Sequence, residues 1–188
     1  MAKLKVGIIG AGMISEEHLT NYSRDPRVEI AWVADVIEEK AKSRAKQFKV
    51  RKAVADYRKV LGEVDAVSIC TPPAMHLQPA KDAAAAGKHV LCEKPLTMNA
   101  AQAKEMASAC AKAKVQLGVC SARSNLVPEI AISREYVAAG KLGRVYYARV
   151  TSMRRRGRPG LDFWPNVTWF LDSQKSGGGA IMDIGCYD

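Results

Sequence analysis

The chain has 188 residues, a formal net charge of +10, a hydrophobic content of 48% and an aromatic content of 6%. Its length holds one sizeable domain, or one complete domain and part of another, and the lack of a run of about 18 apolar residues excludes a membrane-spanning helix. Its five cysteines are odd in number and never form a Cys-x-x-Cys pair, so they indicate reduced thiols in a cytoplasmic protein and argue against a disulfide framework or a zinc site.

The first two thirds of the chain alternate strand and helix signals, which is typical of a parallel sheet with crossover helices. Short apolar runs predict six strands, at Lys5–Ile9, Val28–Ala34, Val54, Val64–Cys70, His89–Cys92 and Val115–Cys120. The segments between them predict helices, at Met13 onward, Glu38–Phe48, Asp56–Leu61, Met75–Ala86 and Asn99–Ala113, the last with a capping-box signature. The fold class is therefore α/β, and crossovers of this length predict a doubly wound Rossmann sheet with strand order 3-2-1-4-5-6.

The pattern changes after Ser121. Pro128–Ala139 predicts a helix that ends at Gly140, and Gly143–Met153 alternates like a long strand. An irregular stretch then leads to three glycines and an apolar, helix-like tail. We therefore expect a Rossmann domain over residues 1–122 and the beginning of a second, α+β domain over residues 123–188.

A glycine turn joins the first predicted strand to the first predicted helix, with the sequence Gly10-Ala-Gly12-Met-Ile-Ser15. Gly10 allows the tight turn, and Gly12 lets backbone amides approach a pyrophosphate at the helix N-terminus. Ser15 stands where a third glycine would serve helix–strand packing, and a small residue is tolerable there. Asp35 follows the next strand, 20 residues after Ser15, where a carboxylate accepts hydrogen bonds from the ribose hydroxyls of adenosine. The pattern predicts a dinucleotide-binding site.

The carboxylate of Asp35 also predicts which dinucleotide is bound. It would repel the 2′-phosphate of NADP, and Val36 and Ile37 offer no compensating cation. We therefore expect NAD as the cofactor, with NADP disfavoured. The residues expected to contact it are Gly10, Gly12, Met13, Ile14, Asp35, Thr71, Pro72, His76, Glu93 and Lys94.

Two predicted strands end in short motifs, Thr71-Pro72-Pro73 and Glu93-Lys94-Pro95. The carboxyl ends of parallel strands face the cleft in which open sheets bind ligands. Lys94 is therefore a candidate acid or base, whose pKa would have to fall through desolvation and a nearby nicotinamide cation. The alternative interpretation is a solvated surface lysine.

The three histidines receive separate interpretations. His76 either contacts the nicotinamide end of the cofactor or is structural, and His18 and His89 are interpreted as structural. In the tail, Asp183 and Tyr187 lie four residues apart, so on a helix they share one face. A carboxylate and a phenol on one face could bind substrate hydroxyls and relay a proton.

A basic cluster extends from Lys141 to Arg158, with seven basic residues and no acidic one. It could form a nucleic-acid surface through Arg154–Arg158. No recognised nucleic-acid-binding module accompanies it, so an anionic substrate or an interface with another segment is favoured.

Together these motifs resemble the Gfo/Idh/MocA oxidoreductases, the family of glucose-fructose oxidoreductase and inositol dehydrogenase. The matching elements are Gly7-Ile-Ile-Gly10-Ala-Gly12, Cys70-Thr-Pro-Pro73 with His76, Glu93-Lys94-Pro95, Gly157-Arg-Pro-Gly160, Trp169-Phe170 and Ser176-Gly-Gly-Gly-Ala-Ile-Met-Asp183-Ile-Gly-Cys-Tyr187. The resemblance implies an NAD-dependent dehydrogenase that acts on a CH–OH group of a sugar, polyol or related compound. It also implies that Lys94 is the catalytic lysine, with Asp183 holding the substrate and Tyr187 assisting proton removal.

The resemblance carries two further expectations. Tyr187 stands where inositol dehydrogenases have histidine, which argues against an inositol substrate. Family members continue into a large, mostly antiparallel sheet on which they often dimerise, so a homo-oligomer is expected if that domain is complete. The alternative function is a catalytically silent NAD-binding fragment or sensor. Neither a metal, a nucleic acid nor a membrane is expected as a partner.

Overall fold

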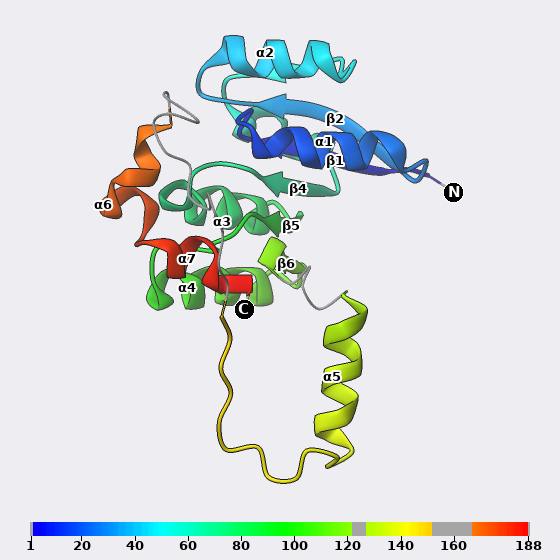
Figure 1. Ribbon diagram of the computed structural model, residues 1–188. Coiled ribbons are helices and arrows are strands. Elements are labelled where there is room, and N and C mark those ends of the chain that lie inside the picture. Colours follow the sequence, from blue (N-terminus) through cyan, green and yellow to red (C-terminus); the bar gives the residue numbers. More distant parts are fainter. Residues whose placement is uncertain (1, 122–126, 152–166, 188) are drawn as a thin grey trace.

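Six parallel strands form the sheet in the described part of the computed structural model, which comprises residues 2–121, 127–151 and 167–187. Their order is β3-β2-β1-β4-β5-β6 (Figure 1), so the predicted Rossmann order 3-2-1-4-5-6 is confirmed. The strands are β1 (Leu4–Ile9), β2 (Val28–Ala34), β3 (Ala53–Val54), β4 (Ala66–Ile69), β5 (His89–Cys92) and β6 (Leu117–Val119).

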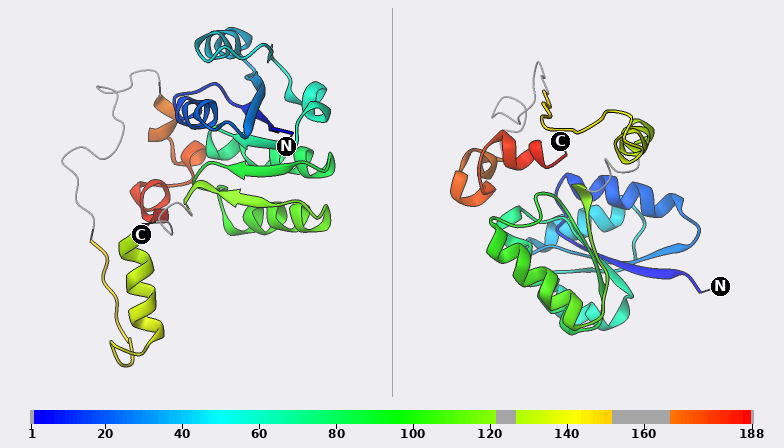
Figure 2. Two further views of the ribbon diagram at one scale, coloured as in Figure 1. Left: turned by 90° about the vertical axis from the view of Figure 1, so that its right-hand side faces the viewer. Right: turned by 90° about the horizontal axis from the view of Figure 1, so that it is seen from below.

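Helices cover both faces of this sheet. On one face lie α1 and α2, and on the other lie α3 and α4 (Figure 2). Their bounds, with those of two 3₁₀ helices, are α1 (Ile14–Arg24), α2 (Glu38–Gln47), η1 (Tyr57–Glu63), η2 (Pro73–Met75), α3 (Leu77–Ala85) and α4 (Ala100–Lys112). Asn99 caps α4 as predicted, because its side chain accepts a hydrogen bond from the amide of Gln102 at 3.0 Å. The return bond of the capping box goes to Met98 instead of Asn99, at 3.2 Å. No helix among the described residues is long and apolar enough to cross a membrane.

Two apolar clusters pack against the two faces of the sheet. Successive residues of β1 point to opposite sides, as the pleat of a strand requires. Ile8 packs into the cluster that contains Leu19 of α1, and Ile9 into the cluster that contains Trp32. Small side chains of α3, chiefly alanine, let that helix approach the sheet closely. None of the five cysteines forms a disulfide, and Cys70, Cys92 and Cys110 are buried, as the sequence indicates.

The position of Gly7 is dictated by Trp32 on the neighbouring strand. Trp32 is fully buried, and its Nε1 donates a hydrogen bond to the carbonyl of Val60 at 3.1 Å. A Cβ atom on Gly7 would lie 2.2 Å from the Trp32 ring. The indole can therefore occupy this place only beside a residue without a side chain.

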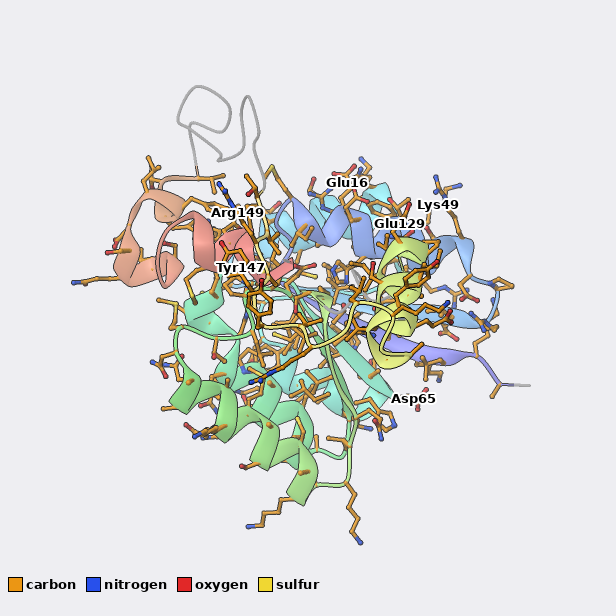
Figure 3. The ribbon with its side chains drawn as sticks, turned by 60° about the horizontal axis from the view of Figure 1, so that its bottom comes forward. Glu16, Lys49, Asp65, Glu129, Tyr147 and Arg149 are labelled. Carbon is orange, nitrogen blue, oxygen red and sulfur yellow. The ribbon has the colours of Figure 1, made fainter. Side chains whose placement is uncertain are left out.

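The segment after the Rossmann sheet begins with α5 (Pro128–Ala138), which is followed by Gly140 at φ +66° as predicted. The long strand predicted at Gly143–Met153 is wrong for the part described, because residues 145–151 have no strand structure. A strand needs a neighbour for its backbone hydrogen bonds, and none of the described strands pairs with this segment. Tyr146 is 92% exposed, and Tyr147 and Arg149 are exposed beside it (Figure 3). The basic residues Arg154–Arg158 lie outside the described residues.

Residues 167–187, called the tail from here on, contain four short helical pieces: η4 (Thr168–Leu171), α6 (Ser173–Ser176), α7 (Ala180–Asp183) and η5 (Gly185–Tyr187). The prediction that Asp183 and Tyr187 share one helix is therefore wrong. The helix stops after Asp183, two residues before Gly185, a residue that disfavours helix continuation. Gly177 packs the tail against Met98, since a Cβ atom there would lie 3.3 Å from the Met98 sulfur. The tail thus lies against the loop that follows β5 (Figure 1).

We expect Gly7→Ala to lower the free energy of unfolding by about 1–3 kcal/mol, the usual cost of overpacking a filled core. The matched control is Gly62→Ala, where an added Cβ would meet no heavy atom within 4 Å. Urea unfolding of both variants measures the difference. Equal losses in the two variants would contradict the packing argument.

Candidate functional site

The glycine turn lies where the carboxyl ends of β1 and β4 meet. Gly10 has φ +97°, and a Cβ atom on it would lie 2.8 Å from the backbone of Cys70. The backbone of Gly10 also donates to the carbonyl of Ala34 at 2.7 Å, which ties the turn to the end of β2. The turn therefore brings three strand ends together at one edge of the sheet, and only glycine fits at its first position.

Asp35 holds this turn from the end of β2. One carboxylate oxygen accepts the amide of Ala11 at 2.8 Å, and the other accepts the amide of Ile37 at 2.9 Å. Each oxygen still has a further lone pair, so the carboxylate can accept hydrogen bonds from a ligand as well. Val36 and Ile37 are 77% and 50% exposed, and they present apolar surface beside the carboxylate.

Arg44 is held against the turn from α2. Its guanidinium donates to the carbonyl of Gly12 at 3.2 Å and to the carboxylate of Glu16 at 2.7 Å. The hydrogen bond from Arg44 lowers the pKa of Glu16 below its usual value. Arg44 is thus already engaged by the turn and by a carboxylate.

The start of α1 is open on the side of the turn. A Cβ atom on Gly12 would meet no heavy atom within 4 Å, and Met13 and Ile14 are 46% and 37% exposed. The helix has 11 residues and begins with amides that have no partner within the helix. An anion of pyrophosphate size is favoured at such a place, both by these amides and by the helix dipole.

Lys94 and Asp183 meet at the end of β5. The Lys94 Nζ donates to the Asp183 carboxylate at 2.7 Å and to the carbonyl of the same residue at 2.9 Å. Both side chains are only 16% exposed. The alternative of a freely solvated Lys94 is therefore not what the structure shows. The peptide bond that follows, Lys94-Pro95, is cis.

No contact of Tyr187 with Lys94 or Asp183 is given by the described residues. Its backbone closes the 3₁₀ turn η5, whereas Asp183 ends α7. The placement of the Tyr187 side chain lies outside the described part of the structure. Its predicted catalytic role stays a prediction.

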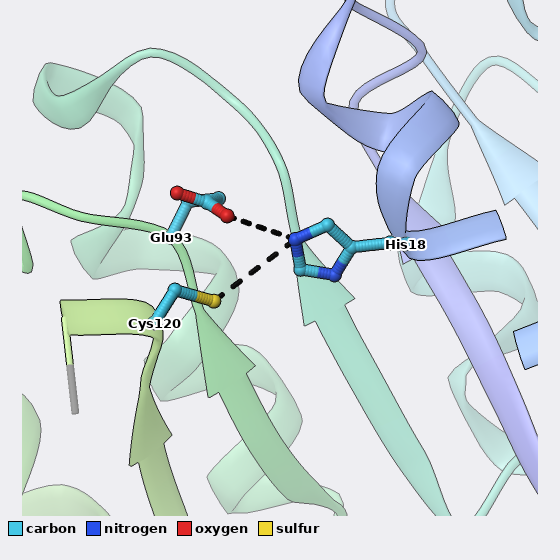
Figure 4. Close-up of side chains that lie close together, drawn as sticks. All are labelled: His18, Glu93 and Cys120. Carbon is cyan, nitrogen blue, oxygen red and sulfur yellow. Dashed lines mark hydrogen bonds and ion pairs between the residues drawn. The ribbon is translucent and has the colours of Figure 1, made fainter. Parts of the chain in front are cut away.

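Glu93 lies behind Lys94 and is 7% exposed. One of its carboxylate oxygens contacts the His18 Nε2 at 2.9 Å (Figure 4). The other accepts the amide of Lys94 at 3.0 Å. Burial raises the pKa of Glu93, but the hydrogen bonds from His18 and from the Lys94 amide outweigh it, so the pKa lies below its usual value. Glu93 is consequently an ionised carboxylate beside the Lys94 backbone.

His76 connects two of the strand-end motifs from the interior. It is completely buried, and its Nε2 lies 2.7 Å from the carbonyl of Thr71. Its Nδ1 lies 3.1 Å from the carbonyls of Pro95 and Leu96. Both ring nitrogens thus face protein carbonyls, which supports the structural interpretation of this residue over direct contact with a cofactor.

His18, interpreted from the sequence as structural, lies beside the end of β5, a contact that the sequence did not predict. His18, Glu93 and Cys120 have ligand-type atoms within 4.8 Å of one another, a grouping that joins three separate elements. The available signal was the position of His18 one turn into the helix that follows the glycine turn, where a polar side chain can reach the strand ends. His89, in contrast, accepts the amide of Gln116 at the opposite edge of the sheet, in keeping with a structural role.

Comparison with known proteins gives matches over both parts of the chain. A family model described as "Oxidoreductase family, NAD-binding Rossmann fold" matches residues 4–121. A second model, described as "GFO/IDH/MocA C-terminal domain", matches residues 131–188.

Individual relatives match along almost the whole chain. The 1,5-anhydro-D-fructose reductase of Ensifer adhaerens is 32% identical over 185 residues, which are 97% of this chain and 53% of the relative. An NAD-binding oxidoreductase from Klebsiella pneumoniae superimposes with a TM-score of 0.76 at 30% identity, over 99% of this chain and 51% of that one. A levoglucosan dehydrogenase, solved in complex with NADH and levoglucosan, superimposes with a TM-score of 0.77 at 26% identity. The match covers 97% of this chain and 51% of the levoglucosan dehydrogenase. The chain therefore spans about half the length of the relatives it matches.

The pKa of Glu93 predicts a specific pH dependence of stability. A carboxyl whose pKa is lower in the folded state stabilises the fold fully above its unfolded pKa of 4.5, and this contribution is lost as the pH falls through the folded value. Glu93→Gln removes the titrating group. We therefore expect the difference in unfolding free energy between wild type and variant to be constant at higher pH and to narrow below pH 4.5. Urea unfolding at a series of pH values measures it, and parallel curves down to acid would contradict the assignment.

Proposed function

The chain belongs to the Gfo/Idh/MocA oxidoreductase family, and from this premise we propose that it serves as an NAD-linked dehydrogenase of sugars, polyols or related hydroxy compounds. The observation that carries the proposal is the Lys94–Asp183 pair, held at the same sheet edge as the open glycine turn. Two of the matched relatives are described as a 1,5-anhydro-D-fructose reductase and a levoglucosan dehydrogenase, which supports a carbohydrate-type substrate.

The residues at the turn fit an NAD molecule. The open space over Gly12 and the helix amides suit the pyrophosphate, and Asp35 suits the adenosine ribose hydroxyls. Asp35 and the apolar Val36 and Ile37 disfavour a 2′-phosphate. The guanidinium of Arg44 is already bound to the Gly12 carbonyl and to Glu16. We propose NAD over NADP for these reasons. When bound, NAD supplies a hydride acceptor for a carbinol carbon.

The remaining chemistry belongs to the chain. We assign Lys94 the transfer of the hydroxyl proton: its neutral amine accepts that proton as the carbon–hydrogen bond breaks, and its ammonium returns a proton in the reverse reaction. Asp183 orients the Lys94 Nζ through the 2.7 Å contact and can accept a hydrogen bond from a substrate hydroxyl. We also propose that Tyr187 assists Lys94 in this proton transfer.

The same assignment divides the chain into two units. Residues 1–122 would form the NAD-binding unit and residues 123–188 would begin the substrate unit, which contributes Asp183. Both units must be present for the lysine and the carboxylate to meet. The second candidate function is NAD binding without turnover, and an activity assay of the wild-type chain distinguishes the two.

Gly12→Ala tests the cofactor site. A Cβ atom there meets nothing in the protein but would enter the space assigned to the pyrophosphate, so stability should change by less than about 1 kcal/mol while NADH affinity falls at least roughly tenfold. Calorimetric titration and thermal unfolding measure the two quantities. Gly62→Ala, equally open, is the control that should retain affinity. Unchanged NADH binding by Gly12→Ala would place the cofactor elsewhere.

Lys94→Met tests the proton transfer. We expect turnover on a sugar and polyol panel, followed by NADH absorbance, to fall by roughly 10²–10⁴-fold, the usual contribution of a general acid or base. NADH binding should persist, because the lost group acts on the substrate. Lys112→Met, an exposed lysine at the end of α4, is the control. Normal turnover by Lys94→Met would refute the assignment, and NADH binding without turnover by the wild-type chain would favour the silent function.

A further inference from the structure

His18 is held on both sides by a chain of buried hydrogen bonds. Its Nε2 lies 2.9 Å from the Glu93 carboxylate, and its Nδ1 lies 2.7 Å from the Ser68 hydroxyl. The Tyr22 hydroxyl in turn donates to Ser68 at 3.3 Å. The side chains of His18 and Glu93 are each only 9% exposed, and Ser68 is fully buried. These residues join α1, β4 and the end of β5.

The donors and acceptors give this series of hydrogen bonds a direction, from Tyr22 to Glu93. Burial raises the pKa of Tyr22, which keeps its hydroxyl protonated as a donor to Ser68. Ser68 can then donate its own proton to the Nδ1 of His18, so that Nε2 carries a hydrogen and donates it to Glu93. The second oxygen of Glu93 accepts the amide of Lys94 at 3.0 Å. Each donor in this series faces an acceptor, and the series ends at the backbone amide of Lys94.

Two other uses of the same side chains are disfavoured by geometry. A nucleophile–histidine–acid triad needs the thiol and the carboxylate on opposite ring nitrogens, whereas Cys120 and Glu93 both approach Nε2, at 4.0 and 2.9 Å. A tetrahedral zinc ion would hold a ligating nitrogen and oxygen roughly 3.4 Å apart. The separation of 2.9 Å is that of a direct hydrogen bond.

We propose that His18 is a positioning residue for Lys94, acting through Glu93 and anchored by Ser68 and Tyr22. The imidazole fixes the Glu93 carboxylate, and this carboxylate fixes the backbone amide of Lys94. The stem of the Lys94 side chain therefore starts from a defined place, from which Nζ reaches Asp183. The inference rests on the proposed function of Lys94 and assigns His18 a role through Glu93, not through contact with substrate or cofactor.

The first measurement is turnover by a matched set of variants. His18→Leu removes the donor to Glu93, while His18→Gln offers a side-chain amide that can replace it. Because misplacing a reacting group by an ångström costs up to about a hundredfold, we expect kcat of His18→Leu to fall roughly ten- to a hundredfold with KM little changed. His18→Gln should recover most of this loss. His89→Gln, at the other edge of the sheet, should leave kcat unchanged.

The second measurement does not depend on turnover. Acetylation by limiting acetic anhydride, mapped by mass spectrometry, reports the reactivity of Lys94 relative to the exposed Lys112. We expect this ratio to change by about threefold or more in His18→Leu and to return toward the wild-type value in His18→Gln. Nitrogen-15 spectra of the wild-type imidazole should show hydrogen on Nε2 and none on Nδ1.

The outcomes separate the inference from the proposed function. One outcome is that the wild-type protein has no turnover, while the acetylation ratio of Lys94 to Lys112 and the His18 tautomer behave as described. The positioning role of His18 then stands and the dehydrogenase assignment fails. If the wild-type chain turns over and His18→Leu retains both kcat and the Lys94 ratio, the positioning role is overturned. Stoichiometric zinc binding that His18→Leu abolishes would also overturn it, in favour of a metal site.

Discussion

Strand β1 lies at the centre of the sheet, between β2 and β4, and the site depends on where its last residues end. All strands are parallel, so their carboxyl ends share one edge, and the chain direction across the sheet reverses on either side of β1. At this point the backbones approach so closely that a Cβ atom on Gly10 would overlap the end of β4. The resulting turn places the N-terminus of α1 at this edge, where the crossover connections lead away from β1 in opposite directions along the sheet. Each further element of the site is placed relative to that turn.

The second constraint is the burial of charge at the end of β5. Lys94, Asp183 and Glu93 are all largely removed from water. A buried ion pair adds little net stability, because desolvation of both charges offsets their attraction, but removing one partner leaves the other uncompensated. The pair is thus better understood as a means of fixing the position of Nζ than as a stabilising contact. The hydrogen bonds around Glu93 serve the same purpose on the backbone side of the lysine.

Local sequence signals predicted the Rossmann sheet because each signal acts over a few residues. Apolar runs predicted the strands, and Asn99 predicted the start of α4. The dinucleotide site at the glycine turn and Asp35 stays a prediction. The errors arise where the outcome depends on residues far away in the chain. Residues 145–151 carry the alternation of a strand, but alternation without a pairing neighbour does not make one. The shared face of Asp183 and Tyr187 assumed a continuous helix, which ends before Gly185. The contact between His18 and Glu93, 75 residues later, could not be predicted, because nothing local indicates it.

We propose that NAD binds along the edge formed by the glycine turn and the end of β5, so that the reaction takes place at Lys94. Titration of the isotopically labelled chain with NADH, followed by backbone amide chemical shifts, tests this placement. The amide shifts should change chiefly at Ala11–Ile14, Asp35 and Lys94. The hollow at the amino ends of the strands, lined by Lys3, Glu29 and Arg51, should be unaffected. Shifts confined to that hollow, or absent from Lys94 at saturation, would show that NAD does not bind at this edge.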